Sequence, residues 1–477
     1  MRLVKLTKKS LKLLIFFSFN SFIFTNMALS DVRSLLEEFE RVNGDLKQAK
    51  EQIKLASLSK ESIFAQLGWS LSSNSYFSQN KLEPLSVSSD YRGGYWNVSA
   101  DISKPFLWGG QFGLENSITS TTLDLTSKTS YQFEQGLSYY QSLGKNFFGR
   151  ETYKALAIAE KEIGVQKITE SFILENKTLQ FYNAYIKVSL EKALLNLEKN
   201  ALARAKKRSE LIRGWVKDGL KRKVDWQQSV MTELQGAERV EMANLRMKGA
   251  LDTLSKLLHR RVSIREVRAL SSNKLRAPRS NLKPLENKNL KLMAEKLKQL
   301  RMSVEKADYS FAPTIQSYVT YNTNQYDESI GTSFSDGAIW NSDNQYTVGI
   351  NLTWPLGFKS EKIEKSKLLV QLNSLQRQQR ETFENLKLDY YFLRQQLFRL
   401  DQSLKSSVKR LSLSKDILKE YTKLYDLGQM DLDQVIRAEE MRIGTETSIV
   451  NYRSQKESLL ASLHNVKGSL RDVLNRN

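Results

Sequence analysis

The residues that could do chemistry in this sequence are few and scattered. It contains no cysteine and only two histidines, His259 and His464, which lie far apart on predicted helices. A disulfide, a thiolate metal site and a lipid-modified cysteine are therefore excluded, and the histidines form no metal-binding constellation. Carboxylates are plentiful, but no histidine-, cysteine- or serine-based constellation and no glycine-rich phosphate loop accompanies them. We therefore expect no enzyme, no cofactor and no metal site.

Charged residues gather instead beside two glycines that interrupt long helical patterns. The first, Gly219, lies in VKDGLKRKVDW, and the second, Gly428, lies in YDLGQMDLDQVIRAEE. A glycine inside a helix costs about 1 kcal/mol relative to alanine, whereas a left-handed glycine commonly closes a helix end. Because long amphipathic segments flank each glycine, we predict two antiparallel helical hairpins whose tips lie at these residues.

The residues after each glycine are the candidate functional residues. After Gly219 they are Lys221, Arg222, Lys223 and Asp225, and after Gly428 they are Asp431, Asp433, Gln434 and Arg437. We expect Asp225 in the first tip, and Asp431 or Asp433 in the second, to cap the returning helix, where a carboxylate also favours the helix dipole. The tip residues are either turn residues alone or, in addition, a gate or docking surface, and the two interpretations are compatible.

The two tips belong to an internal duplication. With Gly428 aligned on Gly219, an offset of 209, the leucines that follow also align without a gap. Nearer the N-terminus, NGDLKQAKEQ resembles NKNLKLMAEK at an offset of 244, so the first copy is 35 residues longer between these landmarks. We predict a first structural repeat over 31–285 and a second over 286–477, each with a helix, strands and a long helical hairpin.

The first 30 residues have the pattern of an export signal. Five basic residues precede the apolar run LLIFFSFNSFIF (13–24), and ALS (28–30) places small residues before the predicted cleavage point. We predict a cleaved signal peptide over 1–30, and an uncleaved membrane anchor is the alternative. No later stretch approaches the ~20 apolar residues of a spanning helix, so we expect an exported mature chain without a transmembrane helix.

The composition narrows the class of protein further. The 477-residue chain has 40% hydrophobic and 26% charged residues, and its mean hydropathy of −0.46 is low for a helical membrane protein. The formal net charge is +21, but the 73 basic residues are interspersed with 52 acidic residues, as on solvated helix faces. Because the chain is also predicted to be exported, we expect no nucleic-acid partner.

Strands are predicted where apolar residues alternate with polar ones. YTVGINLTW (346–354) and WNVSADIS (96–103) keep this alternation, and YQFEQGLSYY (131–140) keeps it loosely. A half-buried sheet in a soluble domain has the same pattern. The predicted export favours a membrane sheet, and so do aromatic residues near the strand ends, which are typical of membrane interfaces. These residues are Trp69, Trp96, Trp108, Tyr139, Tyr140 and Trp354.

The first repeat contains an added strand pair. The stretch 112–131, FGLENSITSTTLDLTSKTSY, fits part of such a pair, and a pair of this kind can account for most of the extra residues. Two alignments of the repeats are open, one that places Pro105 on Pro355 and one that places Leu143 on Leu356. The added pair either extends an external loop or adds strands to a barrel.

The long helices carry the apolar spacing of coiled coils. One seam has steps of 4 and 3 through Leu386, Tyr390, Leu393, Leu397, Leu400 and Leu404, and a further step of 4 leads to Val408. The last helix keeps a similar seam from Tyr452 to Val473. A helix from about Ser360 to Leu427 is on the order of 100 Å long at 1.5 Å per residue, far longer than an ordinary globular helix.

With this order of elements, the sequence resembles the TolC-like outer membrane efflux protein family over nearly the whole mature chain. The resemblance rests on the signal peptide, on the duplicated strand–helix order, on INLTWPLGF (350–358) before a long helix, and on YDLGQMDLDQVIRAEE followed by NYRSQKESLLASLHNVKG. Family members place a Tyr-x-x-Gly turn before the final helix and a Leu-x4-Gly near its end. The matching residues are Tyr425, Gly428, Leu463 and Gly468.

The resemblance implies a homotrimer of mixed α and β structure, with a transmembrane β-barrel in the outer membrane continued by a long α-helical coiled-coil tunnel in the periplasm. A closed barrel leaves no unpaired strand edge in the membrane lipid. The implied function is a passive outer membrane channel of a tripartite efflux or type I secretion system, whose partners are a periplasmic adaptor and an inner-membrane pump. The alternative is an exported, periplasm-spanning coiled-coil structural or adaptor protein without a pore, which leaves the aromatic-ended strands unexplained.

One departure from the family bears on ion preference. In its best-known members, acidic residues six and nine positions after the last-hairpin glycine line the periplasmic entrance and favour cations, whereas here these positions hold Gln434 and Arg437. Because rings of charged side chains set ion preference in a pore, we predict weaker cation selectivity than in those members. The reversal potential of reconstituted channels under a salt gradient measures it, and a strongly cation-selective value contradicts the prediction.

Overall fold

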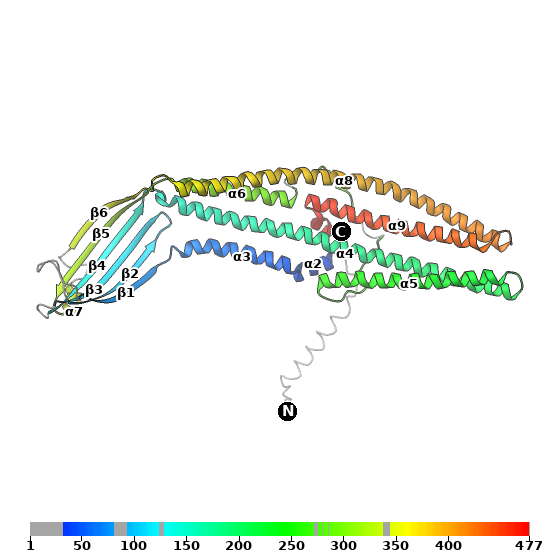
Figure 1. The fold of residues 1–477 in the computed structure, drawn as a ribbon, viewed down its shortest axis with the longest axis horizontal. Helices are drawn as coiled ribbons and strands as arrows, with labels where there is room; N and C mark the ends of the chain where they lie inside the picture. Colours follow the sequence, from blue (N-terminus) through cyan, green and yellow to red (C-terminus); the bar gives the residue numbers. More distant parts are fainter. Residues whose placement is uncertain are drawn as a thin grey trace, which may run out of the picture. The chain divides into compact units, whose positions relative to one another are not determined.

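The computed structural model describes residues 32–80, 93–123, 128–270, 275–278, 280–284, 286–336 and 344–476. The predicted signal peptide over 1–30 lies outside the described residues. Long helices and an antiparallel sheet confirm the expected mixture of α and β structure (Figure 1). The chain divides into a sheet unit, over 51–168 and 292–380, and a hairpin unit, which comprises the rest of the described chain.

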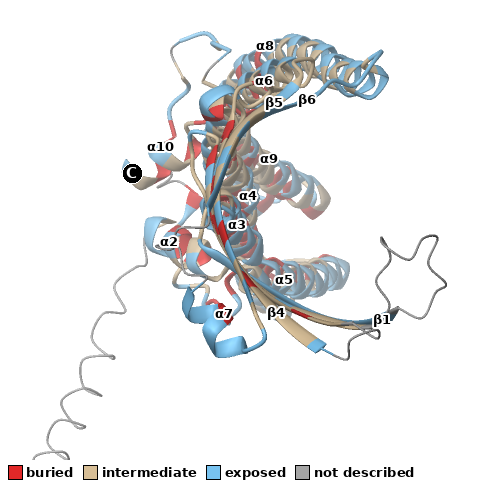
Figure 2. Ribbon diagram, turned by 90° about the vertical axis from the view of Figure 1, so that its left-hand side faces the viewer, coloured by how far each residue is buried: buried red, intermediate tan, exposed pale blue. Residues whose placement is uncertain are grey.

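The sheet unit holds six antiparallel strands that pair in chain order. They are β1 (Ser70–Asn80), β2 (Gly93–Pro105), β3 (Gly110–Leu123), β4 (Lys128–Ser142), β5 (Thr314–Asp327) and β6 (Asn344–Thr353). Figure 2 shows the sheet edge-on as a curved band, with the short helix α7 (Ile330–Asp336) on its convex side.

The strand register separates the polar from the apolar side chains. Because successive residues of a strand point to opposite faces, Asp101 and Glu115, which pair across β2 and β3, share one face. Ile118 and Phe133, which pair across β3 and β4, share the other. The ring of Phe334 in α7 lies 4.8 Å from that of Phe133, so the apolar face is the convex one and the polar face is the concave one.

The added strands of the first repeat belong to the sheet and not to an external loop. β4 leads through Leu143 into α4 (Arg150–Lys217), as β6 leads through Leu356 into α8 (Lys359–Asp426), which favours the alignment of these two leucines. The strands without a counterpart in the second repeat are therefore β2 and β3. The stretch 112–131 covers most of β3, which belongs to the added pair as predicted, and the start of β4, which does not.

The long helices pair as hairpins. α4 and α8 have 68 residues each, and their returning partners α5 (Lys223–Leu258) and α9 (Leu432–Lys467) have 36 each. The other helices of the described residues are α2 (Val32–Val42), α3 (Gly44–Ala65), the short 3-10 helix η1 (Phe147–Gly149), α6 (Lys288–Tyr309) and α10 (Leu470–Arg476). Among the described helices, none combines the length and the apolar character that crossing a bilayer requires.

The predicted seam of α8 is confirmed up to Leu404 and is wrong at its next position. Tyr390 and Leu397 are buried, but the seam then passes through Ser407, which is 1% exposed, while Val408 is 48% exposed. A step of 3 at this point keeps the buried stripe on the side that faces the neighbouring helices, whereas the predicted step of 4 turns it away. The predicted final seam is also interrupted, because Gly468, at φ +68°, ends α9 before α10 begins.

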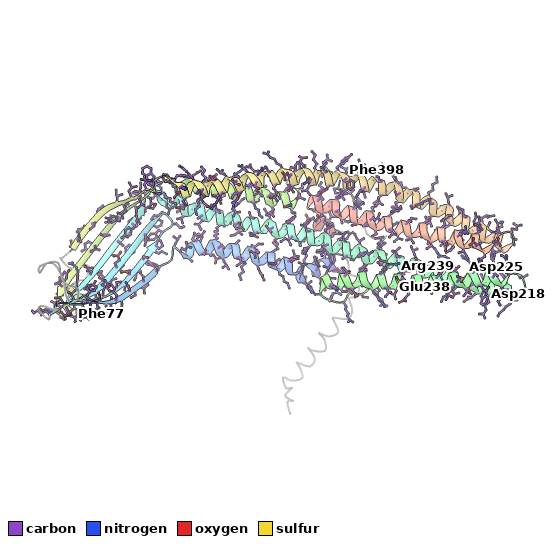
Figure 3. All side chains as sticks on the ribbon, in the orientation of Figure 1. Phe77, Asp218, Asp225, Glu238, Arg239 and Phe398 are labelled. Carbon is purple, nitrogen blue, oxygen red and sulfur yellow. The ribbon has the colours of Figure 1, made fainter. Side chains whose placement is uncertain are left out.

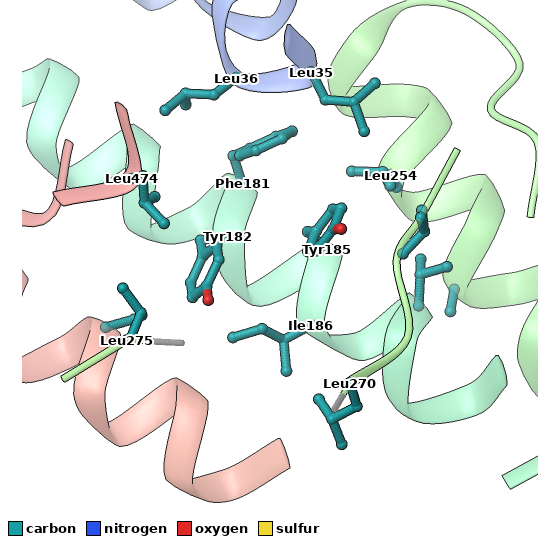
Figure 4. Close-up of a cluster of buried hydrophobic side chains, with 14 of the residues drawn as sticks. Leu35, Leu36, Phe181, Tyr182, Tyr185, Ile186, Leu254, Leu270, Leu275 and Leu474 are labelled. Carbon is teal, nitrogen blue, oxygen red and sulfur yellow. The ribbon is translucent and has the colours of Figure 1, made fainter. Parts of the chain in front are cut away.

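The main core of the hairpin unit lies around one stretch of α4 (Figure 4). Phe181, Tyr182, Tyr185 and Ile186 are at most 2% exposed there. They belong to one buried cluster with residues of the surrounding helices, namely Leu35, Leu36 and Phe39 of α2, Leu254 of α5 and Leu474 of α10. The short helices α2 and α10 therefore complete a core that the long helices leave open.

A buried carboxyl group holds α10 against this core. The Oε1 atom of Glu175 accepts a hydrogen bond of 2.5 Å from the backbone N–H of Leu470, at the start of α10. Burial raises the pKa of Glu175 to about 7, although the backbone hydrogen bonds oppose the rise. The group therefore titrates near neutral pH.

We predict that the hairpin unit loses stability as the pH rises from about 5 to about 8. A carboxyl group whose pKa is raised by folding stabilises fully below its unfolded pKa, and the contribution is lost as the pH passes through the folded value. Glu175→Gln should flatten this slope, and Glu170→Gln, at a partly exposed position of the same helix, should retain it. Thermal unfolding across this pH range measures the slope, and equal slopes in wild type and Glu175→Gln contradict the assignment.

Candidate functional site

Both predicted hairpin tips exist. Gly219 follows α4 at φ +74° and Gly428 follows α8 at φ +75°, the left-handed conformation that ends a helix. At the first tip, the backbone N–H of Leu220 donates to the carbonyl of Trp215 over 2.8 Å and closes the last turn of α4. Figure 3 labels Asp225 on the returning helix. The two glycines therefore reverse the chain where the sequence places the turns.

The predicted helix cap is wrong at the first tip. At the second tip, a predicted residue occupies the N-cap position but makes no capping hydrogen bond. The N-cap of α5 is Arg222, and Asp225 lies within the first turn and is 3% exposed. Asp431 is the N-cap of α9, but its side chain makes no capping hydrogen bond. Nη2 of Arg222 instead donates to both carboxylates, over 3.1 Å to Asp225 and 2.9 Å to Asp431. Arg222 therefore binds both of the carboxylates that were predicted to cap the helices, and its bond to Asp431 joins the two hairpins.

Lys221 makes a second link between the hairpins. Its Nζ atom donates to the backbone carbonyl of Tyr425 over 2.6 Å and lies 4.0 Å from the centre of that tyrosine ring. The ring of Trp215 lies 6.3 Å from the same ring, centre to centre. The end of α8 is therefore held by a hydrogen bond, a cation–π contact and an aromatic contact from the first hairpin.

The other predicted tip residues remain at the surface. Lys223 and Gln434 are exposed. Arg437 pairs with Asp433 on the same helix, over 2.9 Å between Nε and Oδ2. An exposed pair of this kind contributes little to stability. Gln434 and Arg437 are both exposed to solvent, and their role in ion preference stays a prediction.

A small apolar cluster beneath the tips escaped the sequence analysis as a unit. Ile212, Tyr425, Leu432 and Val435 are at most 4% exposed and come from α4, α8 and α9. Burial, with the nearby charge of Asp225, raises the pKa of Tyr425 to about 12, so its hydroxyl stays protonated. The sequence signal was an apolar residue every three or four positions on either side of Gly428.

Ion pairs of largely buried glutamates with partly exposed arginines also join the helices, and sequence reasoning missed them. Nε of Arg204 in α4 lies 2.6 Å from Oε1 of Glu439 in α9, which is 6% exposed. Between α4 and α5, Glu198 pairs with Arg239 over 3.3 Å and Glu191 pairs with Arg246 over 3.5 Å. The usable signal was the matched spacing of seven between the two acids and between the two arginines, which is the heptad repeat.

The predicted interface aromatics lie at two levels of the sheet. Trp69 precedes β1, Trp108 joins β2 to β3, Trp354 follows β6, and Tyr139 lies near the end of β4. These positions share one end of the sheet, and Nε1 of Trp108 donates to the hydroxyl of Tyr139 over 3.4 Å.

Trp96 marks the opposite end of the sheet. It pairs in register with Phe77 of β1, which Figure 3 labels, and its ring lies 6.3 Å from that of Tyr131 on β4. Along β4, Tyr131 and Tyr139 are eight residues apart, or ~27 Å at ~3.4 Å per residue. The aromatic residues selected from the sequence therefore lie near both ends of the sheet.

Comparison with known proteins supports the fold. No protein-family model and no curated protein matches the sequence. Solved structures do match, among them CusC, with a TM-score of 0.69 and 12% identity over 92% of both chains. The outer membrane protein VceC from Vibrio cholerae has a TM-score of 0.67 and 15% identity over 91% of this chain and 95% of its own. The outer membrane channel CmeC from Campylobacter jejuni has 0.65 and 12% over 92% and 85%.

The chain therefore has the fold of outer membrane channel proteins, as its resemblance to the TolC-like family implied. At 12 to 15% identity, the likeness concerns the fold, which is shared over nearly the full length of both chains.

We predict that apolar contacts hold the tips together more firmly than the ion pairs. Leu432→Ala removes a side chain that is 1% exposed, at a cost of about 2–5 kcal/mol. Asp431→Asn removes only the exposed ion pair with Arg222 and should loosen the tips less. Hydrogen exchange of the backbone amides in the first turns of α9 measures this, with Gln434→Ala as an exposed control. Faster exchange in Asp431→Asn than in Leu432→Ala contradicts the ranking.

Proposed function

We propose that this chain is the outer membrane channel of a tripartite efflux or type I secretion system. The observation that carries the proposal is the fold that it shares, over more than nine tenths of its length, with solved outer membrane channels. In this function, the protein lies in the outer membrane and extends into the periplasm, where an adaptor connects it to an inner-membrane pump. The pump supplies the energy, so the channel is a passive conduit that needs no catalytic residue.

The exposed face of the sheet supports contact with membrane lipid. On β6, Val348, Ile350 and Leu352 are 77%, 69% and 61% exposed, although all three are apolar. A soluble protein rarely leaves such a row open to water. The aromatic levels lie ~27 Å apart along the strands, which at a barrel tilt of about 40° is ~20 Å along the membrane normal, against an apolar band of about 25 Å in outer membrane barrels. The convex face therefore suits lipid, and the polar concave face suits a water-filled lumen.

The edges of the sheet support a homotrimer. β1 and β6 are the two edge strands, and an unpaired edge in lipid leaves backbone groups without hydrogen bonds. If β6 of one copy pairs with β1 of the next, three copies of the six-stranded sheet close into an 18-stranded barrel. Barrels of this size leave an aqueous channel.

The edges of the hairpin unit support the same assembly. Ion pairs join α5 to α4, α4 to α9, and α9 to α8, so that α5 and α8 are the outer helices of this series. Each carries exposed apolar residues. On α5 they are Val224, Met231, Leu234, Met242 and Leu245, and on α8 they include Leu388, Tyr391, Phe392 and Phe398, the last labelled in Figure 3. A contact between α5 of one copy and α8 of the next is heterologous and closes into a ring.

Membrane fractionation and native size analysis test the proposal. We expect the protein in the outer membrane fraction and, after extraction in detergent, as a trimer. Recovery as a soluble periplasmic monomer rejects the channel and favours a coiled-coil structural or adaptor protein.

Two matched variants of α5 test the helical contact. Leu234→Lys places a charge in the exposed apolar stripe and should reduce the trimer fraction, because burying an unpaired charge is unfavourable. Ala237→Lys adds the same charge at an exposed position of α5 outside the stripe and should leave the trimer intact. An equal loss of trimer in both variants contradicts the assigned interface.

We predict that the added strands widen the barrel. Deletion of residues 93–123 removes β2 and β3 and leaves the end of β1 beside the start of β4, because all four strand ends lie together. The barrel then has 12 strands instead of 18, and its diameter falls by about a third, because barrel diameter grows with strand number. The largest polyethylene glycol that enters from the barrel side of reconstituted trimers measures the width. An unchanged size limit in a trimeric deletion variant contradicts the prediction.

A further inference from the structure

The chain between α5 and α6, residues 259–287, has a charge that the long helices do not share. It contains eight basic and two acidic residues, whereas basic and acidic residues are interspersed along the helices. Its described residues are 259–270, 275–278, 280–284 and 286–287, and we call them the strap. A connection between two helices does not by itself require such a surplus of positive charge.

Hydrogen bonds fix the course of the strap across the hairpin unit. Lys192 of α4 donates to two of its carbonyl oxygens, over 2.7 and 3.0 Å. Further along, Nε2 of His464 in α9 lies 2.8 Å from the carbonyl oxygen of Arg276, and the hydroxyl of Tyr390 in α8 donates to that of Ser280 over 2.9 Å. The strap therefore leaves the end of α5 and crosses α4, α9 and α8 in turn. Because packed helices lie about 8–10 Å apart, it covers roughly 30 Å.

The strap buries its apolar side chains and exposes its cations. Four apolar residues are at most 8% exposed and belong to the main core, and Figure 4 labels two of them, Leu270 and Leu275. The other two are Val262 and Val267. The core therefore holds the strap in place.

The exposed cations of the strap form a row that continues onto α8. At that end, Nη1 of Arg394 donates to Oδ1 of Asn281 over 3.4 Å, so this exposed arginine adjoins the strap. We call the exposed cations the cationic row, and they are Arg261, Arg265, Arg276, Lys283 and Arg394.

The acidic residues of the strap and of α2 are already paired. Arg260 pairs with Glu266 of the strap and with Glu38 of α2, over 2.7 and 2.5 Å. The remaining acidic residues of these two segments have partners in the pairs Lys467–Glu286, Arg33–Glu37 and Arg471–Glu40. No member of the cationic row makes an ion pair with a described residue. The positive charge of the row is therefore open to a partner outside the chain.

An extended polyanion fits the cationic row better than a small anion does. A small anion reaches one or two of these side chains, whereas a polymer with carboxylates along its length reaches all of them. Arginine pairs with a carboxylate through two parallel hydrogen bonds. Each exposed pair is weak by itself, but several pairs formed at once by one polymer raise the overall affinity.

We propose that the strap binds peptidoglycan, the carboxylate-bearing polymer of the cell wall. This inference rests on the proposed function, which places the hairpin unit in the periplasm, where the cell wall is the extended polyanion within reach. The strap begins at the end of α5 away from Gly219, and α5 has 36 residues, or about 54 Å of helix. A cell wall bound at the strap therefore leaves the hairpin tips free for other contacts.

Cosedimentation with purified peptidoglycan sacculi tests the proposal. The full chain, held in nanodiscs of phosphatidylcholine, should pellet with the sacculi at about 0.1 M salt and stay in the supernatant at about 1 M, where the Debye length falls to about 3 Å. Sacculi whose carboxylates have been converted to amides should not bind it, because the charge of the acceptor is lost. Absence of binding, or equal binding to both kinds of sacculi, overturns the proposal. Stronger binding to vesicles of phosphatidylglycerol than to sacculi also overturns it, because the row then selects lipid phosphate.

Matched variants test the assignment to the strap. One combined variant removes three cations of the row, by Arg261→Gln, Arg265→Gln and Arg276→Gln, and should lower the bound fraction by about fivefold, because three pairs are lost at once. Lysine at the same three positions keeps the charge and should retain most of the binding. The control removes three exposed cations of α4 nearer the tip, by Lys206→Gln, Arg213→Gln and Lys217→Gln, and should bind as the wild type does. An equal loss in the two glutamine variants contradicts the assigned surface.

The size of the same samples separates this inference from the proposed function. A trimer from the outer membrane that does not bind sacculi contradicts the inference alone. A soluble monomer contradicts the channel, and its binding to sacculi still measures the strap, because the strap belongs to a single chain.

Discussion

The need to bury the apolar stripe of very long helices governs this structure. A helix of 68 residues cannot bury such a stripe against itself, so α4 and α8 each need a partner along their length. The turns at Gly219 and Gly428 supply these partners by returning the chain as α5 and α9. The two hairpins then pack side by side through α4 and α9, where the buried aromatic residues and ion pairs concentrate.

This solution leaves surfaces that one chain does not cover. The outer helices keep exposed apolar residues, and the sheet keeps an exposed apolar face and two open edges. In the proposed channel, lipid covers the sheet face, and strands of neighbouring copies satisfy the backbone groups of the edges. In the proposed trimer, neighbouring copies of the chain therefore complete both units.

Ion pairs and apolar contacts both join the two hairpins at their tips. Arg222 bridges the buried carboxylate of Asp225 and the exposed one of Asp431, and solvent weakens the second pair. Leu432 and Tyr425 fill the space beneath. Deeper in the hairpins, Glu439 is almost fully buried, and its pairing with Arg204 is needed to offset the loss of hydration. Close packing is incomplete between these two levels, where a pocket of about 270 Å³ lies beside Tyr425.

The sequence by itself determined the order of the elements, the positions of both tips, the long helices and the alternation of the strands. Each of these features is encoded in residues a few positions apart, such as a glycine between two apolar seams. The tertiary structure decided what depends on distant partners. The Asp431 side chain bonds to Arg222 of the first hairpin and does not cap α9, and Ser407, not Val408, is the buried residue where α8 packs against its neighbours. It also placed β2 and β3 inside the sheet, because strand pairing depends on the register between separate segments and not on the pattern within one.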